Sequence, residues 1–319
     1  MDIFQEVISA RQRIEAHTLK TPLLYSHYLS HRVGGQVYLK MESEQHTGSF
    51  KARGALNKLV WLARQDDHAP IITASTGNHG LGVARALQIT RRKGRIVLPE
   101  NTVATKREAL EAYGADIEQH GDDCFVSESY ARRRASEEGW TYISPYNDPQ
   151  VIGGQGTVAI EIAEQLPERV DNVFVTVGGG GLIAGIGSYL KKVHPEVRLL
   201  GCQPENSPEM ALSVRTGQYT TVEPQETLSD ASAGAFEETS ITFPLCRQVV
   251  DEFFLVPEPA IADHIRLLLA RERKLVEGAA AVAVAALLQD PARWRDQTSV
   301  VVICGGNISV DKLRGVVCG

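Results

Sequence analysis

The chain has 319 residues, of which 43% are hydrophobic and 23% charged, and its formal net charge is −6. This composition suits a protein with a sizeable buried core, and the acidic balance argues against nucleic acid or an anionic membrane as a partner. The five cysteines are odd in number and show no Cys-x-x-Cys spacing, so neither a disulfide framework nor a zinc site is expected. No basic region followed by an apolar run stands at the N-terminus, and no apolar stretch is long enough to cross a bilayer. We therefore expect a cytoplasmic protein without a signal peptide or a membrane-spanning segment.

Short apolar runs alternate with helical patterns along most of the chain. Strands are predicted at 37–41, 71–74, 95–98, 141–143, 173–177, 198–202 and 300–304. Helices are predicted from Lys51 onward and at 80–87, 106–113, 124–138, 156–166, 182–193, 260–272 and 279–288. This alternation is typical of right-handed β-α-β units in mostly parallel sheets. Seven strands and a long amphipathic N-terminus are more than one simple sheet would hold. We therefore predict an α/β protein of two doubly wound sheets with a cleft between them.

Lys51 follows Ser49 and Phe50 and stands at the mouth of a predicted helix. A helix N-terminus disfavours a nearby ammonium, so the amine is biased towards its neutral, nucleophilic form. A neutral lysine amine is what Schiff-base chemistry with an aldehyde cofactor requires. Most lysines are solvated surface charges, and this position alone leaves that interpretation open.

Four consecutive glycines, residues 178–181, come directly after a predicted strand and open the helix that begins at Leu182. Their backbone N–H groups have no Cβ in front of them and stand at a helix N-terminus, which together favours a phosphate. The run matches neither Gly-x-x-x-x-Gly-Lys-Ser/Thr nor Gly-x-Gly-x-x-Gly, so nucleotide hydrolysis is unsupported and a dinucleotide site is the weaker interpretation. A tight turn without a ligand is the alternative.

Two further turns follow predicted strands. Residues 74–80 carry small hydroxyl residues and Asn78, which suits a carboxylate or a phenolate oxygen, although Ser75 or Asn78 can simply cap the next helix. Cys304 stands at the end of the last strand, where ligands of α/β sheets bind. A buried cysteine acting as a small hydrophobe is the alternative there.

Together these motifs resemble the fold-type-II pyridoxal-phosphate enzymes, which have the tryptophan synthase β-like fold, and in particular their serine/threonine dehydratase and serine racemase branch. The resemblance spans essentially the whole chain through the motifs at 21–23, 49–51, 75–80, 153–157, 178–181, 276–278 and 304–307. It implies pyridoxal 5′-phosphate in the cleft between a large domain, residues 1–60 plus 149–319, and a small mobile domain, residues 61–148. A homodimer and the absence of the regulatory C-terminal domain of biosynthetic threonine dehydratases are also expected.

The same resemblance assigns roles to individual residues. It makes Lys51 the Schiff-base lysine, Phe50 the residue flanking the cofactor ring, and Cys304 the partner of the pyridine nitrogen. Asn78 would bond the cofactor's 3′-oxygen. The phosphate loop would consist of Gly178, Gly179, Gly180, Gly181 and Leu182, and the substrate would be held by Ser75, Asn78 and His79 at its carboxylate and Asn147 near its hydroxyl.

The implied reaction is a β-elimination in which Lys51 removes the α-proton of an amino acid. A neutral thiol at the pyridine nitrogen makes the ring a milder electron sink, which favours loss of a β-hydroxyl. We therefore predict a lyase: an ammonia-lyase (dehydratase) that converts an L-threonine, L-serine or 3-hydroxyaspartate type substrate into a 2-oxo acid and ammonia.

The alternative on this scaffold is a serine or aspartate type racemase. Thr76 stands where racemases carry a serine that returns a proton from the face opposite the lysine, but its β-branching restricts the hydroxyl. A β-replacement synthase is less consistent with His79 and the Cys304 turn. A purely binding protein has no need of Lys51.

A divalent cation, Mg²⁺ or Ca²⁺, is the least supported expectation. The branch's metal segment begins Glu-Pro, whereas this chain has Gln203 before Pro204, which removes a charged oxygen ligand. Glu209 and the carbonyl of Ser207 remain as candidate ligands. The irregular stretch 229–239 is expected to form a lengthened loop near the substrate, which leaves the side-chain pocket undefined.

Overall fold

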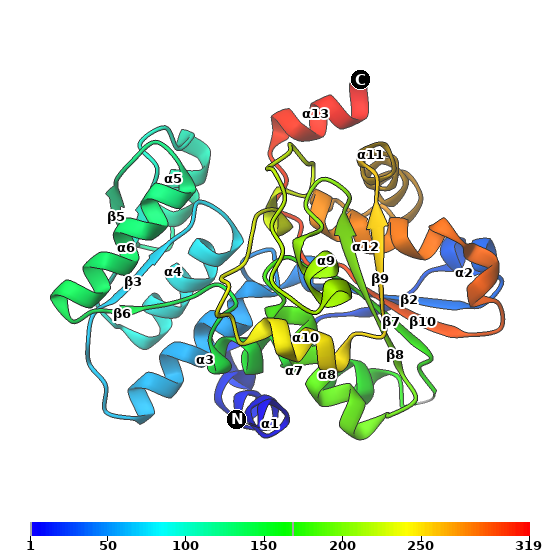
Figure 1. Cartoon of the computed structure of the whole chain (residues 1–319), viewed down its shortest axis with the longest axis horizontal. Coiled ribbons are helices and arrows are strands. Elements are labelled where there is room, and N and C mark those ends of the chain that lie inside the picture. Colours follow the sequence, from blue (N-terminus) through cyan, green and yellow to red (C-terminus); the bar gives the residue numbers. More distant parts are fainter. Residues whose placement is uncertain (1, 168) are drawn as a thin grey trace.

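The computed structural model describes residues 2–167 and 169–319, which contain two β-sheets (Figure 1). The larger sheet has the strand order β1 (Leu23–Tyr25), β2 (Gln36–Lys40), β10 (Thr298–Val302), β7 (Asn172–Thr176), β8 (Arg198–Pro204) and β9 (Glu252–Val256). The smaller sheet has the order β5 (Asp116–Gln119), β4 (Gly94–Leu98), β3 (Ile71–Ala74) and β6 (Thr141–Tyr142). Neighbouring strands pair in parallel except β1 and β2, which are antiparallel. The prediction of an α/β protein with two mostly parallel sheets is confirmed.

The α-helices connect the strands and flank the sheets. Those up to the end of the smaller sheet are α1 (Ile3–Ile14), α2 (His27–Val33), α3 (Lys51–Arg64), α4 (Asn78–Thr90), α5 (Ala104–Glu111) and α6 (Cys124–Glu138). The later ones are α7 (Pro149–Gln165), α8 (Gly181–Val193), α9 (Glu209–Thr216), α10 (Thr242–Val249), α11 (Glu258–Leu267), α12 (Gly278–Gln289) and α13 (Val310–Cys318). Within the described residues, no helix combines the length and apolar character needed to cross a membrane.

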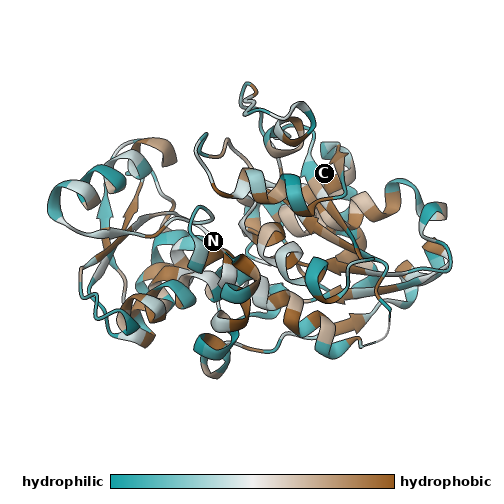
Figure 2. Cartoon of the chain, turned by 60° about the horizontal axis from the view of Figure 1, so that its bottom comes forward, coloured by the Kyte–Doolittle hydropathy of each residue, from teal (hydrophilic) through white to brown (hydrophobic). Residues whose placement is uncertain are grey.

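The larger sheet is covered by helices on both sides. α8 packs against β7 and β8, α12 packs against β7 to β10, and Figure 1 shows the two helices on opposite sides of these strands. Strand β7 is consequently buried along its whole length. Figure 2 shows hydrophobic residues concentrated along these inner strands and helices, with hydrophilic residues on the outer helix faces. The carboxyl ends of the parallel strands therefore form a rigid edge on which a site can be built.

Helix α3 joins the two sheets. Its residues Leu56 and Leu59 belong to a buried cluster with Ile71 of β3 and Val151 of α7. α3 also contacts α4 beside the smaller sheet and α7 beside the larger one. Because Lys51 is the first residue of α3, it lies at the junction of the two sheets.

Three strands are absent from the sequence-based predictions, and all three lie at sheet edges. β1 and β9 are the outer strands of the larger sheet, and β5 is an outer strand of the smaller one. An edge strand is buried on fewer sides, so β5 (Asp-Ile-Glu-Gln) carries polar residues and no apolar run. The predicted strands all appear, with ends that differ by up to two residues.

Helix α7 begins at Pro149, seven positions before the predicted start at residue 156. Its glycines hide the helical pattern in the sequence, and the structure shows why they are there. A Cβ on Gly154 would lie 2.6 Å from the Cα of Gly54 in α3, and a Cβ on Gly156 would lie 2.3 Å from Val7 in α1. The glycines therefore serve close helix packing, and the Asp148 side chain caps the helix start.

Candidate active site

The Lys51 amine faces a cavity between the two sheets. Its Nζ donates a hydrogen bond to the carbonyl oxygen of Pro145 at 2.9 Å and lies 5.3 Å from the centre of the Phe50 ring. Burial lowers the pKa of Lys51 to about 8, against the opposing influence of Cys304 and Glu277. Desolvation thus raises the neutral fraction of this amine at a given pH, a physical cause that the sequence argument from the helix N-terminus did not include.

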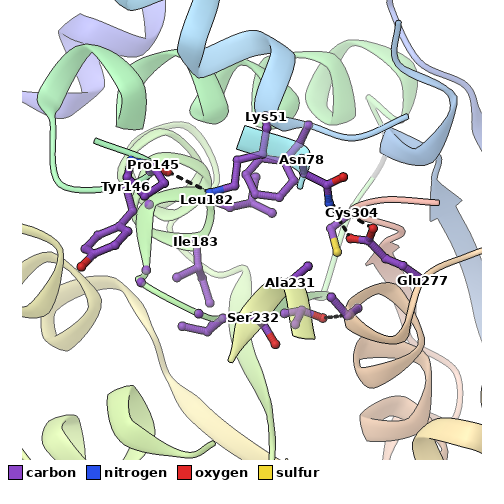
Figure 3. A pocket seen from close by; sticks show the side chains of 18 residues that line it. Lys51, Asn78, Pro145, Tyr146, Leu182, Ile183, Ala231, Ser232, Glu277 and Cys304 are labelled. Atoms are coloured by element: carbon purple, nitrogen blue, oxygen red, sulfur yellow. Dashed lines mark hydrogen bonds between the residues drawn. The ribbon is translucent and has the colours of Figure 1, made fainter. Parts of the chain in front are cut away.

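The cavity is partly open to solvent and has about 50 Å³ of space for the centres of water-sized molecules. Figure 3 shows Lys51, Asn78, Leu182, Glu277 and Cys304 arranged around it. All residues that the resemblance assigned to the cofactor line this one cavity: Phe50, Lys51, Asn78, Gly178, Gly179, Gly180, Gly181, Leu182 and Cys304.

The four glycines connect β7 to α8. Gly180 has a φ of +85°, a left-handed conformation that favours glycine, and α8 has no side-chain cap, so its first N–H groups are free to meet an anion. A Cβ on Gly179 would lie 2.4 Å from the Tyr146 ring, and one on Gly178 would lie 3.0 Å from the Ser232 carbonyl oxygen. The loop is thus a cradle of bare backbone, which fits a phosphate group.

Cys304 and Glu277 stand side by side on the cavity wall. Burial, together with the nearby Glu277, raises the pKa of the Cys304 thiol well above its ordinary value, so the thiol is neutral. Burial also raises the pKa of Glu277 to about 7. No site role was predicted for Glu277, although the motif at 276–278, one of those that carry the family resemblance, contains it.

The turn between β3 and α4 places Ser75, Thr76 and His79 outside the residues that line the cavity. Ser75 Oγ accepts a hydrogen bond from Gly77 N at 3.2 Å, as in a local turn. His79 is buried, its Nε2 pairs with the Ile143 carbonyl oxygen at 3.0 Å, and burial lowers its pKa to about 3. His79 is therefore a neutral imidazole, and its predicted contact with a substrate carboxylate stays a prediction.

Asn147 lies beside the cavity but is also absent from its lining. Its Nδ2 donates to Glu237 at 2.7 Å, and its Oδ1 accepts from Ile241 N at 3.0 Å. The neighbouring Tyr146, which does line the cavity, accepts a hydrogen bond from Glu237 N. Asn147 thus ties the loop containing residues 237–241 to the cavity rim.

The candidate cation ligands contact each other and Gln203. Ser207 Oγ donates to Glu209 at 2.7 Å, while Gln203 Nε2 donates to the Ser207 carbonyl oxygen at 3.2 Å. An amide N–H thus takes one of the two lone pairs of this carbonyl oxygen. Among the described residues, no group of three or more His, Cys, Asp or Glu side chains is placed to hold a metal ion.

A buried network of charges anchors the first turn of α3. Arg53 pairs with Glu42 at 2.7 Å and with Glu161 at 2.6 Å, and Lys40 pairs with Glu161 at 2.6 Å. Each of these side chains is at most 1% exposed. Because Arg53 lies two residues after Lys51, the network fixes the start of the helix that carries the amine.

A buried amine, an anion cradle and a neutral thiol around one cavity define an enzyme site that fits a phosphorylated aldehyde cofactor. The family model described as "Pyridoxal-phosphate dependent enzyme" matches residues 14–305. The chain therefore belongs to this family, its cofactor is pyridoxal phosphate, and the resemblance seen in the sequence is confirmed.

Individual proteins that resemble this chain include an L-threonine ammonia-lyase, a threonine deaminase and a serine racemase. An L-threonine ammonia-lyase from Thermotoga maritima is 39% identical over 317 residues, covering 99% of this chain and 78% of the relative. The structure of the processed form of threonine deaminase isoform 2 from Solanum lycopersicum matches with a TM-score of 0.93 and 32% identity, covering 98% of this chain and 87% of the other. Maize serine racemase matches with a TM-score of 0.91 and 30% identity, covering 98% and 95%.

Proposed function

We infer that this chain is a pyridoxal-phosphate-dependent ammonia-lyase that eliminates water from a β-hydroxy amino acid and releases a 2-oxo acid and ammonia. The observation that carries this inference is the presence, in one cavity, of a Lys51 amine with a lowered pKa and a neutral thiol at Cys304. The names of the threonine ammonia-lyase and threonine deaminase relatives make L-threonine the first substrate to test, followed by L-serine and 3-hydroxyaspartate.

Each residue around the cavity has a distinct task in this proposal. Lys51 Nζ holds the cofactor and, when free, takes the proton from the substrate α-carbon. The N–H groups of residues 178–181 bind the phosphate, and Phe50 packs along the ring. Cys304 offers a hydrogen bond to the ring nitrogen without placing a negative charge there. Bound pyridoxal phosphate supplies the electron sink for the substrate's α-carbon.

Turnover on a panel of amino acids tests this proposal directly. Purified protein loaded with the cofactor is offered L-threonine, L-serine, 3-hydroxyaspartate and their D-enantiomers, and 2-oxo acid and ammonia are measured. We expect equal amounts of the two products from an L-β-hydroxy amino acid. A protein that binds the cofactor but releases neither product from any member of the panel is not the proposed lyase.

The lowered pKa of Lys51 predicts the pH dependence of cofactor attachment. Only the neutral amine attacks an aldehyde, and its fraction rises through pH 8, whereas an ordinary lysine with a pKa of 10.5 would still be protonated there. In cofactor-free protein, the rate of reaction with pyridoxal should rise about tenfold per pH unit below 8 and level off above it. Stopped-flow absorbance measures this rate. A rate that keeps rising steeply to about pH 10 would show that Lys51 is not desolvated.

Replacing Gly179 with valine tests the phosphate cradle. The added side chain meets the Tyr146 ring and fills the space in front of the backbone N–H groups. We expect the Kd for pyridoxal phosphate to rise by at least about tenfold, or roughly 1.4 kcal/mol. Gly315→Val is the matched control, because a Cβ at Gly315 meets nothing within 4 Å. Equal affinities in two folded variants would place the phosphate elsewhere.

A racemase remains the second candidate, supported by the likeness to maize serine racemase and by the hydroxyl of Thr76 in the turn before α4. If Thr76 returns a proton from the face opposite Lys51, Thr76→Ser should raise the yield of D-amino acid, and Thr76→Ala should remove it while 2-oxo acid formation continues. Chiral chromatography gives the ratio of the two products. Predominant D-amino acid from the unmodified chain would move it into the isomerase class.

The wider organisation is proposed on the same basis. We propose that residues 61–148 form the small domain that moves over the substrate, that residues 1–60 plus 149–319 form the cofactor-binding domain, and that the protein acts as a cytoplasmic homodimer. The two separate sheets support the division into domains. Light scattering of the purified protein tests the dimer, and limited proteolysis with and without substrate tests the movement.

A further inference from the structure

Glu277 is a buried carboxyl group to which the proposed elimination assigns no step, since Lys51 already serves as the base. It precedes α12 and is 4% exposed. Both of its oxygens face the amide nitrogen of Asn78, with Nδ2 at 2.9 Å from Oε1 and 3.0 Å from Oε2 (Figure 3). Its Oε2 also accepts a hydrogen bond from Asn307 N at 3.2 Å. The carboxyl group is therefore held from two directions, and one of its partners lines the cavity.

The oxygen of the Asn78 amide meets a hydrogen-bond donor, whereas its nitrogen meets an acceptor. Asn78 Oδ1 accepts a hydrogen bond from Asn307 Nδ2 at 2.6 Å, and the same nitrogen donates to the Thr47 carbonyl oxygen at 2.8 Å. If the Asn78 amide turned over, its oxygen would face the oxygens of Glu277 and its nitrogen would face the NH₂ group of Asn307. With Glu277 ionised, neither contact makes a hydrogen bond, so only one orientation of Asn78 is satisfied.

The backbone leaves room for this carboxyl group and for little else. A Cβ on Gly305 would lie 2.4 Å from Glu277 Oε1, so the chain after Cys304 passes directly over it. The side-chain nitrogen of Asn78 has two N–H bonds, and the carboxyl group of Glu277 accepts only from the N–H that faces it. The second N–H is left to the cavity that Asn78 lines.

We propose that Glu277 is a positioning residue that fixes the amide of Asn78, so that its free N–H points into the cavity and donates to the 3′-oxygen of the bound cofactor. The proposal rests on the function proposed above for Asn78. It adds that Asn78 binds the cofactor well only because Glu277 and Asn307 hold its amide from both sides. Glu277 is not assigned a proton-transfer step.

Glu277→Gln is the informative substitution because it keeps the shape and changes the pairing. A glutamine presents both an N–H and an oxygen to Asn78, so residue 277 no longer selects one orientation of the Asn78 amide. We expect the Kd for pyridoxal phosphate to rise about tenfold. We also expect the absorption maximum of the loaded protein to shift in the same direction as in Asn78→Ala, because both variants lose the hydrogen bond at the 3′-oxygen.

A double-mutant cycle separates positioning from a direct role. If Glu277 acts through Asn78, the Glu277→Gln change should have no further effect on Kd or on the spectrum once Asn78 is alanine. Independent effects that multiply in the double variant would show that Glu277 contacts the cofactor by itself, which overturns the proposal. Should Glu277→Gln fail to fold, Asn307→Ala removes the opposite partner of Asn78 and enters the same cycle with the same expectation.

Two outcomes distinguish a failure of the proposed function from a failure of the role of Glu277. An unmodified chain that does not bind the cofactor defeats the proposed function and this proposal together. A chain that binds the cofactor through Lys51 with unchanged Kd and spectrum in Asn78→Ala defeats only the role of Glu277.

Discussion

Replacing Lys51 with alanine is expected to abolish turnover, with kcat lowered at least about 10³-fold, because the same amine holds the cofactor and removes the α-proton. The amine is placed for both tasks by the start of α3 and made nucleophilic by burial. The variant should also lose the absorption band and the adduct that borohydride traps in the unmodified protein. Peptide mass spectrometry after reduction locates that adduct.

Lys192→Ala is the control for this substitution. Lys192 is exposed near the C-terminal end of α8, the helix whose first turn follows the phosphate loop, and no change in turnover or spectrum is expected. A borohydride-stable cofactor adduct on a lysine other than Lys51 would contradict the assignment of the site.

Replacing Arg53 with methionine is expected to lower the free energy of unfolding by about 3–5 kcal/mol. Methionine fills much of the space but leaves the carboxylates of Glu42 and Glu161 buried with fewer partners. The loss follows from uncompensated charge, since removing one member of a buried pair leaves the desolvation cost of the other. The shift in the urea unfolding midpoint measures it.

The matched control is Arg107→Met, which removes an arginine from the exposed pair with Glu111 in α5. An exposed pair is screened by water, and we expect a change below about 1 kcal/mol. If both substitutions cost the same, the buried network contributes no more than a surface pair, and its role in fixing the start of α3 has no support.

Much of the fold follows from local sequence. The alternation of apolar runs and helical patterns predicts parallel strands joined by helices, because a strand buried on both faces needs a continuous apolar run. The helix at Lys51 and the glycine loop before α8 could also be predicted, because caps, turns and glycines act over a few residues. Of the three missed edge strands, β5 (Asp-Ile-Glu-Gln) has no apolar run and β1 (Leu-Leu-Tyr) has only three residues. The apolar run of β9 (Glu-Phe-Phe-Leu-Val) was not assigned to a strand.

Some of the predicted site residues line the cavity and others do not. Lys51, Asn78, the four glycines and Cys304 were named from local motifs and from family resemblance, and the structure brings them to one cavity. Ser75, Thr76 and His79 were named in the same manner, yet they lie outside its lining, because a turn motif does not specify which of its side chains face inward.

Tertiary structure alone decided the environment of these groups. The sequence contains Lys51 and Glu277, but their lowered and raised pKa values come from burial by segments distant in the chain. Glu277 meets Asn78 across 199 positions of sequence. Hydrogen bonds and desolvation depend on distances of a few ångströms, and such distances between remote segments exist only once both sheets have formed and α3 has packed between them.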